Sequence, residues 1–192
     1  DPEGVRSHLG AVADPGSDAF ASLNAVLMVD GALIHVAAGG VASCPIELLH
    51  ISVGMDEPAM AHPHHLVVLE DGARASLIER YVALGEAVYF NNAVMEIVLG
   101  RGAELQHDRL QEESPSAYHL AALHVAQSGD SRYRHATAAI GGPRRRRWES
   151  LSPPSRASCG KSSRALAAGH PLGDAAGLRD VCTKTAQQFQ PA

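Results

Sequence analysis

The chain of 192 residues is long enough for one domain with a sizeable core, and its charge is divided unevenly. Residues 1–142 carry 18 acidic residues against 7 arginines and no lysine, whereas residues 143–192 carry 9 basic residues against 3 acidic ones. The acidic body argues against nonspecific nucleic-acid binding, which needs clustered cations, and the short apolar runs exclude a membrane-spanning helix of about 20 residues.

The three cysteines are Cys44, Cys159 and Cys182, and they form neither a Cys-x-x-Cys pair nor an even set for disulfides. This usage favours a reducing compartment, so we expect a cytoplasmic protein. The acidic start lacks Met and a basic region followed by an apolar one. No secretion signal is therefore predicted, and the chain resembles a fragment.

The N-terminal residues 1–17 are rich in Gly, Pro and Asp and are expected to form a loose segment. A short turn of helix through Phe20 and Leu23 is predicted next. Ser17 or Asp18 could cap this turn, because their side-chain oxygens accept the first free amide hydrogens.

Most of the remaining body is predicted to be β-structure. The Asp30–Gly31 pair indicates a hairpin or tight turn between strands at 25–29 and 32–36, because glycine tolerates a positive φ. Further strand-like runs lie at 46–53, 66–70, 73–82, 87–99, 103–111, 117–127 and 131–140. Apolar residues on both faces of several runs indicate strands that are covered on more than one side.

A repeat of about 30 residues is the most informative pattern in the chain. Val68-Leu69-Glu70-Asp71-Gly72-Ala73 is matched by Val98-Leu99-Gly100-Arg101-Gly102-Ala103, and a third turn, Ser128-Gly129-Asp130, follows after a similar interval. Such a repeat is typical of a solenoid, because no single unit can bury its apolar face without its neighbours. The predicted fold class is all-β, as a β-helix or a sandwich.

A series of short motifs follows the order seen in one known family. They are Phe20–Ala25, Asp30–Val36, Cys44-Pro45-Ile46, His62-Pro63, Leu66–Ala73, Leu77–Tyr81, Tyr89–Asn92, Glu96–Gly100, Gly102-Ala103 and Leu110-Gln111. Between residues 18 and 142 the chain thus resembles the core domain shared by the SufB and SufD iron–sulfur cluster assembly proteins. SufB usually carries Glu-Gly-Cys where this chain has Glu79-Arg80-Tyr81, so the resemblance is closer to SufD.

The resemblance implies a right-handed parallel β-helix over residues 18–142. It implies an accessory scaffold subunit that pairs with SufB and is engaged by the ATPase SufC, rather than an enzyme. The chain has no Gly-x-x-x-x-Gly-Lys-Ser/Thr phosphate loop of its own. We therefore expect no catalytic residue, metal ligand or cofactor on this chain, because the resemblance implies that the iron–sulfur cluster is assembled by the whole complex. Neither a nucleic acid nor a membrane is expected as a partner.

We expect the resemblance to end at Gly142, where the family continues with more coils and a helical end. Arg, Ser, Ala, Pro and Gly make up 30 of the 50 residues from 143 to 192, which predicts a disordered basic tail. A frameshift is one explanation of this truncation and a natural tail is the other. The family's cluster histidine and its contacts with SufB and SufC lie in the missing portion, and Cys159 and Cys182 match no family motif, so no cluster ligand is assigned.

A cupin-like metal-dependent enzyme is the alternative function. His62-Pro63-His64-His65 followed by Glu70 loosely resembles the first cupin motif, in which His62, His64 and Glu70 would hold divalent iron, manganese or zinc. The second cupin motif is absent from the sequence. The simpler interpretation is a polar loop that enters a strand, with His64 and His65 solvated.

Two further patterns suggest chemistry only weakly. Glu79 and Glu96 could form a glycosidase pair, which needs carboxylates roughly 5 to 9.5 Å apart. Aromatic residues for sugar stacking are only 4% of the chain, so these glutamates are expected to be solvated strand positions or members of an interface. Arg144–Arg147 beside Trp148 could bind single-stranded nucleic acid, but without a folded platform a solvated charge run is favoured.

Overall fold

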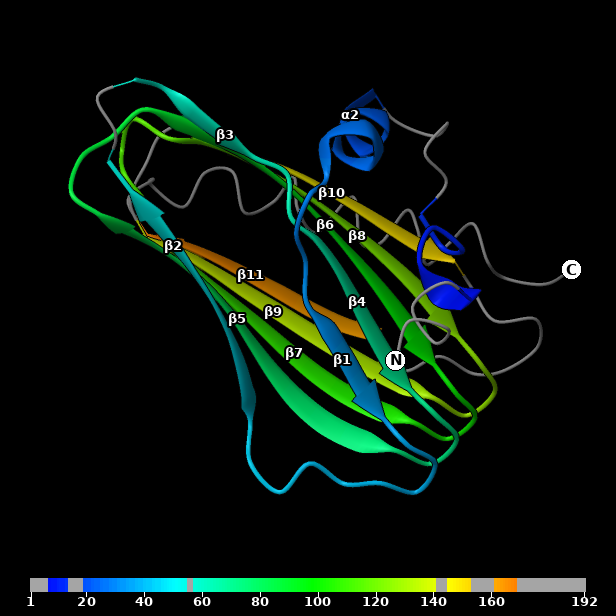
Figure 1. Ribbon diagram of the computed structural model, residues 1–192. Helices are drawn as coiled ribbons and strands as arrows, with labels where there is room; N and C mark the ends of the chain where they lie inside the picture. Colours follow the sequence, from blue (N-terminus) through cyan, green and yellow to red (C-terminus); the bar gives the residue numbers. More distant parts are fainter. Residues whose placement is uncertain (1–6, 14–18, 55–56, 141–144, 153–160, 169–192) are drawn as a thin grey trace, which may run out of the picture.

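The computed structural model describes residues 7–13, 19–54, 57–140, 145–152 and 161–168. Two parallel sheets face each other, and one helix, α2 (Ala19–Leu27), lies over the outer side of sheet A (Figure 1). Sheet A contains β1 (Leu33–Val36), β3 (Ala59–Ala61), β4 (His64–Leu69), β6 (Tyr89–Leu99), β8 (Tyr118–Gln127) and β10 (Arg145–Ser152). Sheet B contains β2 (Ile46–Val53), β5 (Arg74–Leu84), β7 (Glu104–Glu112), β9 (Arg132–Ile140) and β11 (Lys161–Ala168).

The chain alternates between the two sheets as it advances. The sheet orders are β1-β4-β6-β8-β10 and β2-β5-β7-β9-β11, and neighbouring strands pair in parallel. Each coil therefore adds one strand to each sheet and covers the coil before it. The prediction of an all-β solenoid is confirmed. Within the described residues, no helix is long and apolar enough to cross a membrane.

The repeated turns set the register between coils. Gly72 and Gly102 have φ values of 69° and 66°, and Asp130 takes the equivalent third position at 60°. The Gly72 amide donates to the Arg101 carbonyl at 2.8 Å, and the Gly102 amide donates to the Gly129 carbonyl at 2.9 Å. Because the left-handed region favours glycine, the sequence repeat reports a repeated backbone conformation.

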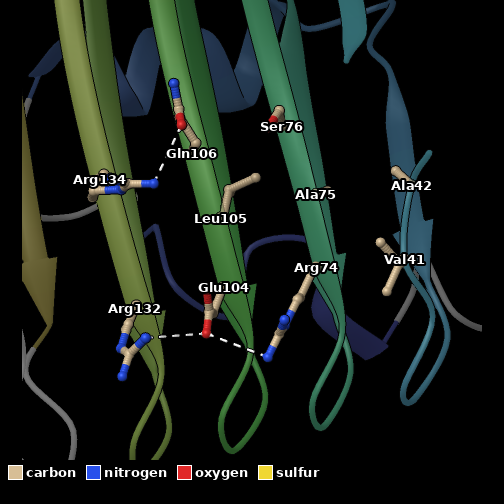
Figure 2. A pocket seen from close by; sticks show the side chains of 10 residues that line it. All are labelled: Val41, Ala42, Arg74, Ala75, Ser76, Glu104, Leu105, Gln106, Arg132 and Arg134. Carbon is tan, nitrogen blue, oxygen red and sulfur yellow. Dashed lines mark hydrogen bonds and ion pairs between the residues drawn. The ribbon is translucent and has the colours of Figure 1, made fainter. Parts of the chain in front are cut away.

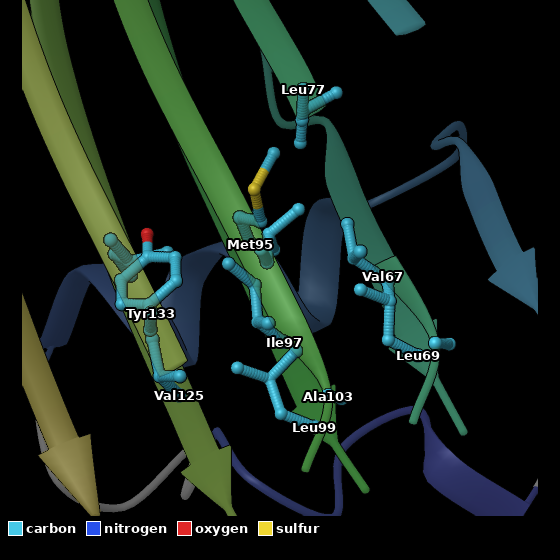
Figure 3. Packing of buried hydrophobic residues seen from close by; sticks show 12 residues of the cluster. Val67, Leu69, Leu77, Met95, Ile97, Leu99, Ala103, Val125 and Tyr133 are labelled. Atoms are coloured by element: carbon cyan, nitrogen blue, oxygen red, sulfur yellow. The ribbon is translucent and has the colours of Figure 1, made fainter. Parts of the chain in front are cut away.

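The core lies between the sheets, on the side of these turns. Val67, Ile97 and Val125 occupy one register row of sheet A and are almost fully buried. Leu69 and Leu99 form the next row, and Leu77 and Leu105 of sheet B are also in the cluster (Figure 3). Burying such a side chain contributes about 1.5 to 3 kcal/mol, so stacking like residues stabilises each added coil.

The predicted hairpin at Asp30–Gly31 is wrong. Residues 25–27 belong to α2, and β1 pairs in parallel with β4 rather than with a preceding strand. The His64 amide donates to the Asp30 carbonyl at 3.0 Å, and a Cβ on Gly31 would lie 1.8 Å from the His64 carbonyl oxygen. Glycine is therefore needed here for close approach to the next coil and not for a hairpin turn.

The expected loose N-terminal segment is corrected in part. The amides of Gly10, Val12 and Ala13 all donate to one glutamate of β6, and Ala13 is buried. Residues 7–13 therefore lie against sheet A, and we call them the strap. The predicted cap at Ser17 and Asp18 falls outside the described residues.

The expected disordered tail is also corrected in part. Strand β10 pairs with β8 and strand β11 pairs with β9, so both sheets continue beyond Gly142. Ladder hydrogen bonds are made by the backbone, so an exposed edge can accept a segment without clear apolar alternation. Cys159, Cys182 and residues 169–192 lie outside the described residues.

Candidate functional site

A buried polar network lies inside the solenoid, beyond the apolar core. Its centre is Glu79 of β5, which points inward together with Tyr81, because alternate residues of a strand share a face. Glu79 Oε2 accepts hydrogen bonds from Arg109 Nε at 2.6 Å and His107 Nε2 at 2.9 Å. Glu79 Oε1 accepts one from the Tyr81 hydroxyl at 2.5 Å. Both carboxylate oxygens are therefore occupied by neighbouring side chains.

The charges of this network follow from its burial and its contacts. Burial alone would raise the pKa of Glu79, but Arg109 and His107 together hold it well below its ordinary value. Burial lowers the pKa of His107, against the opposing effect of Glu79. His107 Nδ1 lies 2.9 Å from the Tyr133 hydroxyl, which can donate to it. The arrangement is thus one buried ion pair braced by a neutral histidine, which suits an anchor between coils better than a general base.

Three further imidazoles surround Tyr81 in the interior. The rings of His50 and His119 lie 4.2 Å and 4.6 Å from the Tyr81 ring, and His65 lies 4.9 Å from His50. Burial lowers the pKa of His65 to about 4, and the neighbouring His50 adds to this effect. Burial also lowers the pKa of His50. Burial therefore favours the neutral form of His50 and His65 near pH 7.

We expect the protein to lose stability as the pH falls from about 6.5 to about 4, the ordinary and folded pKa values of His65. In this pH range His65 is protonated in the unfolded chain but stays neutral in the folded chain. The His65 contribution between pH 6.5 and 4.5 is about 2 kcal/mol. Urea denaturation at the two pH values should show a smaller loss in His65→Gln, which can still accept the Ala32 amide.

The half-exposed His35 provides the control for this experiment. His35→Gln should lose more stability over this pH range than His65→Gln, because it leaves the buried His65 in place. An equal loss of stability in wild type and His65→Gln would contradict the assignment to His65.

A second buried carboxylate holds the strap on the outer side of sheet A. Glu96 accepts the amides of Gly10, Val12 and Ala13 at 2.6, 2.8 and 2.9 Å. His64 Nε2 lies 2.8 Å from Glu96 Oε1. Burial would raise the pKa of Glu96, but these hydrogen bonds hold it below its ordinary value. The Glu96 carboxylate thus ties the strap to β6, the third strand in the order of sheet A.

The same arrangement places His64 between two polar side chains. Asn24 Nδ2 donates to the carbonyls of Pro63 and Asn92, so its Oδ1 is the atom that faces His64 Nδ1 at 2.8 Å. His64 therefore faces an acceptor at each ring nitrogen. The imidazole thus links Asn24 of α2 to Glu96 of β6.

The cupin-like site is not assembled. His62 Nδ1 accepts from Asn92 Nδ2 at 3.3 Å, whereas Glu70 lies on the surface with His35 at 2.9 Å and His64 binds Glu96. Among the described residues, no group of three or more His, Cys, Asp or Glu could hold a metal ion. The expectation that His64 and His65 are solvated is also wrong, since both are buried beneath the strap or inside the coils.

The possible glycosidase pair is also excluded by position. Glu79 points into the solenoid from sheet B, whereas Glu96 faces outward from sheet A. The expectation that they are solvated is wrong, because each has an exposed fraction of 0%. Their neighbours in space come from distant segments, which strand patterns do not reveal.

A shallow depression of about 440 Å³ marks the outer face of sheet B. Arg74, Glu104 and Arg132 form one cross-strand row, and Ser76, Gln106 and Arg134 form the next (Figure 2). Arg132 Nη1 and Arg74 Nη2 lie 3.3 and 3.7 Å from the same oxygen of Glu104. This cluster was not predicted from the sequence, although the repeat of about 30 residues is the signal that aligns these positions.

Comparison with known proteins adds the family. A model described as "SUF system FeS cluster assembly, SufBD core domain" matches residues 50–168, so the similarity does not stop at Gly142. An iron–sulfur cluster assembly SufBD family protein of Synechocystis is 36% identical over 140 residues, which cover 69% of this chain and 31% of that protein. Protein ABCI7, chloroplastic, of Arabidopsis thaliana is 30% identical over 131 residues, covering 65% and 28%.

The iron–sulfur cluster assembly protein SufD of Escherichia coli is 38% identical over 79 residues, which cover 40% of this chain and 19% of SufD. The chain thus spans less than a third of the length of these relatives. The family model nevertheless covers more than half of the chain and follows the coils of both sheets. The chain belongs to the SufBD core domain family of the SUF system for iron–sulfur cluster assembly.

Proposed function

We propose that this chain is a SufD-like scaffold component of iron–sulfur cluster assembly that acts with SufB and SufC homologues in the cytoplasm. The observation that carries the proposal is the match of the SufBD core model to the stacked coils over residues 50–168. A parallel solenoid presents extended rigid faces, which suit a subunit that positions partners. The relatives are longer, so cluster assembly itself is proposed for the complex and not for this chain alone.

An accessory role also agrees with the interior chemistry. Glu79 is the most deeply embedded carboxylate of sheet B, and its hydrogen bonds go to Tyr81, His107 and Arg109. A general base needs a free lone pair within reach of a substrate proton. Buried and occupied in this way, Glu79 supports the solenoid and offers no reactive site.

Co-expression of the tagged chain with SufB and SufC homologues tests the proposal. We expect both homologues to co-elute with the chain, and reconstitution with iron and sulfide to give more of the visible absorbance of bound clusters than SufB and SufC alone. An Ile97→Asp variant, which places a charge in the core, is the control for binding that depends on the fold. Absence of both effects with the folded wild-type chain would reject the proposed function.

A further inference from the structure

We propose that the depression on the outer face of sheet B is a docking site for an acidic segment of a partner protein. Arg74, Arg132 and Arg134 would bind its carboxylates. The inference rests on the geometry of this face and does not depend on the proposed role in cluster assembly. The occupant is a peptide segment that carries Asp or Glu side chains.

Sheet register brings the three arginines together. Arg74 of β5 pairs with Glu104 of β7, and Glu104 pairs with Arg132 of β9, while Arg134 lies two residues farther along the same face. Neighbouring residues within such a cross-strand row are separated by the spacing between strands, about 4.8 Å. Adjacent coils therefore project cationic groups from one surface into one depression (Figure 2).

These arginines are less completely neutralised than Arg80 and Arg109. Arg109 is buried against Glu79 at 2.6 Å, and Arg80 lies 2.7 Å from its own partner, Glu112. Arg74 and Arg132 instead share a single oxygen of Glu104 at 3.7 and 3.3 Å. Two guanidinium groups on one carboxylate leave donors free for another anion.

Arg134 adds a third positive charge, and it contacts the neutral side chain of Gln106. Its Nη2 lies 3.3 Å from Gln106 Oε1, and Gln106 Nε2 donates to Asp108 at 3.0 Å. Gln106 therefore holds Arg134 in place. The side-chain amide of Gln106 lies between Arg134 and the Asp108 carboxylate. With Glu104 as the one acidic group in the lining, the depression carries a net charge of about +2.

The surroundings favour a short acidic peptide over a nucleic acid. Residues 1–142 carry 18 acidic residues against 7 arginines, so a long polyanion would meet repulsion outside the depression. Half of the six arginines whose side chains are described lie in the depression, which concentrates the attraction locally. Val41, 66% exposed, forms part of its edge and offers an apolar contact to an extended chain.

Fluorescence anisotropy with a labelled peptide of alternating glutamate and serine tests the site on the full chain. We expect saturable binding that weakens as salt rises, and at least about tenfold weaker binding by Arg132→Glu/Arg134→Glu. Arg132 is 71% exposed, so folding should survive, which circular dichroism would verify. Arg80→Glu, on the same face but outside the depression, should bind within about twofold of wild type.

Three outcomes would overturn the proposal. These are equal binding of the same peptide with glutamine in place of glutamate, unchanged binding by Arg132→Glu/Arg134→Glu, and a loss in Arg80→Glu as large as in the double variant. Tighter binding of a labelled single-stranded RNA than of the peptide would assign the face to nucleic acid instead. If the acidic peptide does not bind, the docking site is rejected. The proposed function is tested separately, by co-elution with SufB and SufC homologues.

Discussion

Glu79→Gln should lower the free energy of unfolding by about 3 to 5 kcal/mol, because it breaks a buried ion pair. The substitution keeps the side-chain shape but leaves the Arg109 guanidinium, 3% exposed, without its anionic partner. It also replaces one acceptor oxygen by an NH2 group, whereas in wild type Tyr81 and His107 donate to different oxygens of the carboxylate. Urea denaturation followed by circular dichroism measures the difference at pH 7.

Glu112→Gln is the matched control, because Glu112 also pairs with an arginine. That pair, with Arg80, is 35–40% exposed, so its loss should cost less than about 1 kcal/mol. If Glu79→Gln fails to fold, the double variant Glu79→Leu/Arg109→Met should recover folding, since removing both charges leaves none unpaired. Equal small losses in Glu79→Gln and Glu112→Gln would show that the buried pair is not an anchor.

Glu96→Gln should release the strap from sheet A. The carboxylate accepts three amides of residues 10–13 and the His64 ring, and hydrogen bonds to a charged group contribute about 1.5 to 3 kcal/mol. A local loss of about 2 kcal/mol corresponds to roughly 30-fold faster hydrogen exchange at the Gly10, Val12 and Ala13 amides. NMR exchange measurements on wild type and variant would detect this change.

Acid should release the strap in the same way. The pKa of Glu96 is lower in the folded chain than its ordinary value of 4.5, so its contribution is complete above pH 4.5 and is lost as the pH falls through the folded value. Exchange at the three amides should therefore accelerate on acidification in wild type, beyond the intrinsic effect of pH. Glu96→Gln should show no such acceleration.

Glu70→Gln controls for a surface carboxylate. Glu70 binds His35 and the Ala38 amide, whereas the Gly10, Val12 and Ala13 amides all donate to Glu96. Its substitution should leave exchange at Gly10, Val12 and Ala13 unchanged. Faster exchange in Glu70→Gln than in Glu96→Gln would contradict the role assigned to Glu96.

The coils could be predicted because their signals are local and repeated. The glycines at 72 and 102 both mark left-handed turns, and the strand-like runs at 73–82 and 103–111 follow them directly. The expected strand at 46–53 has the bounds of β2, and the expected run at 117–127 differs from β8 by one residue. The family resemblance agreed with these elements because its motifs lie at the same turns.

The errors arose where a distant segment decides the structure. Asp30–Gly31 has the composition of a hairpin turn, but contact with His64 on the next coil decides its role. The region after Gly142 lacks periodicity, yet the unpaired edges of β8 and β9 accept β10 and β11 through backbone hydrogen bonds. Neither competing contact is visible in a local window of sequence.

The period, the repeated turns and most strands could be predicted, because each depends on backbone conformation and on side chains close in the chain. The burial of Glu79 and Glu96 depends on tertiary contacts, since alternation along a strand does not say what covers either face. Coil stacking brings Arg109 to Glu79, and the strap brings backbone amides to Glu96. Polar residues that a strand pattern assigns to solvent thereby become buried, because partners remote in sequence supply the hydrogen bonds that water would otherwise make.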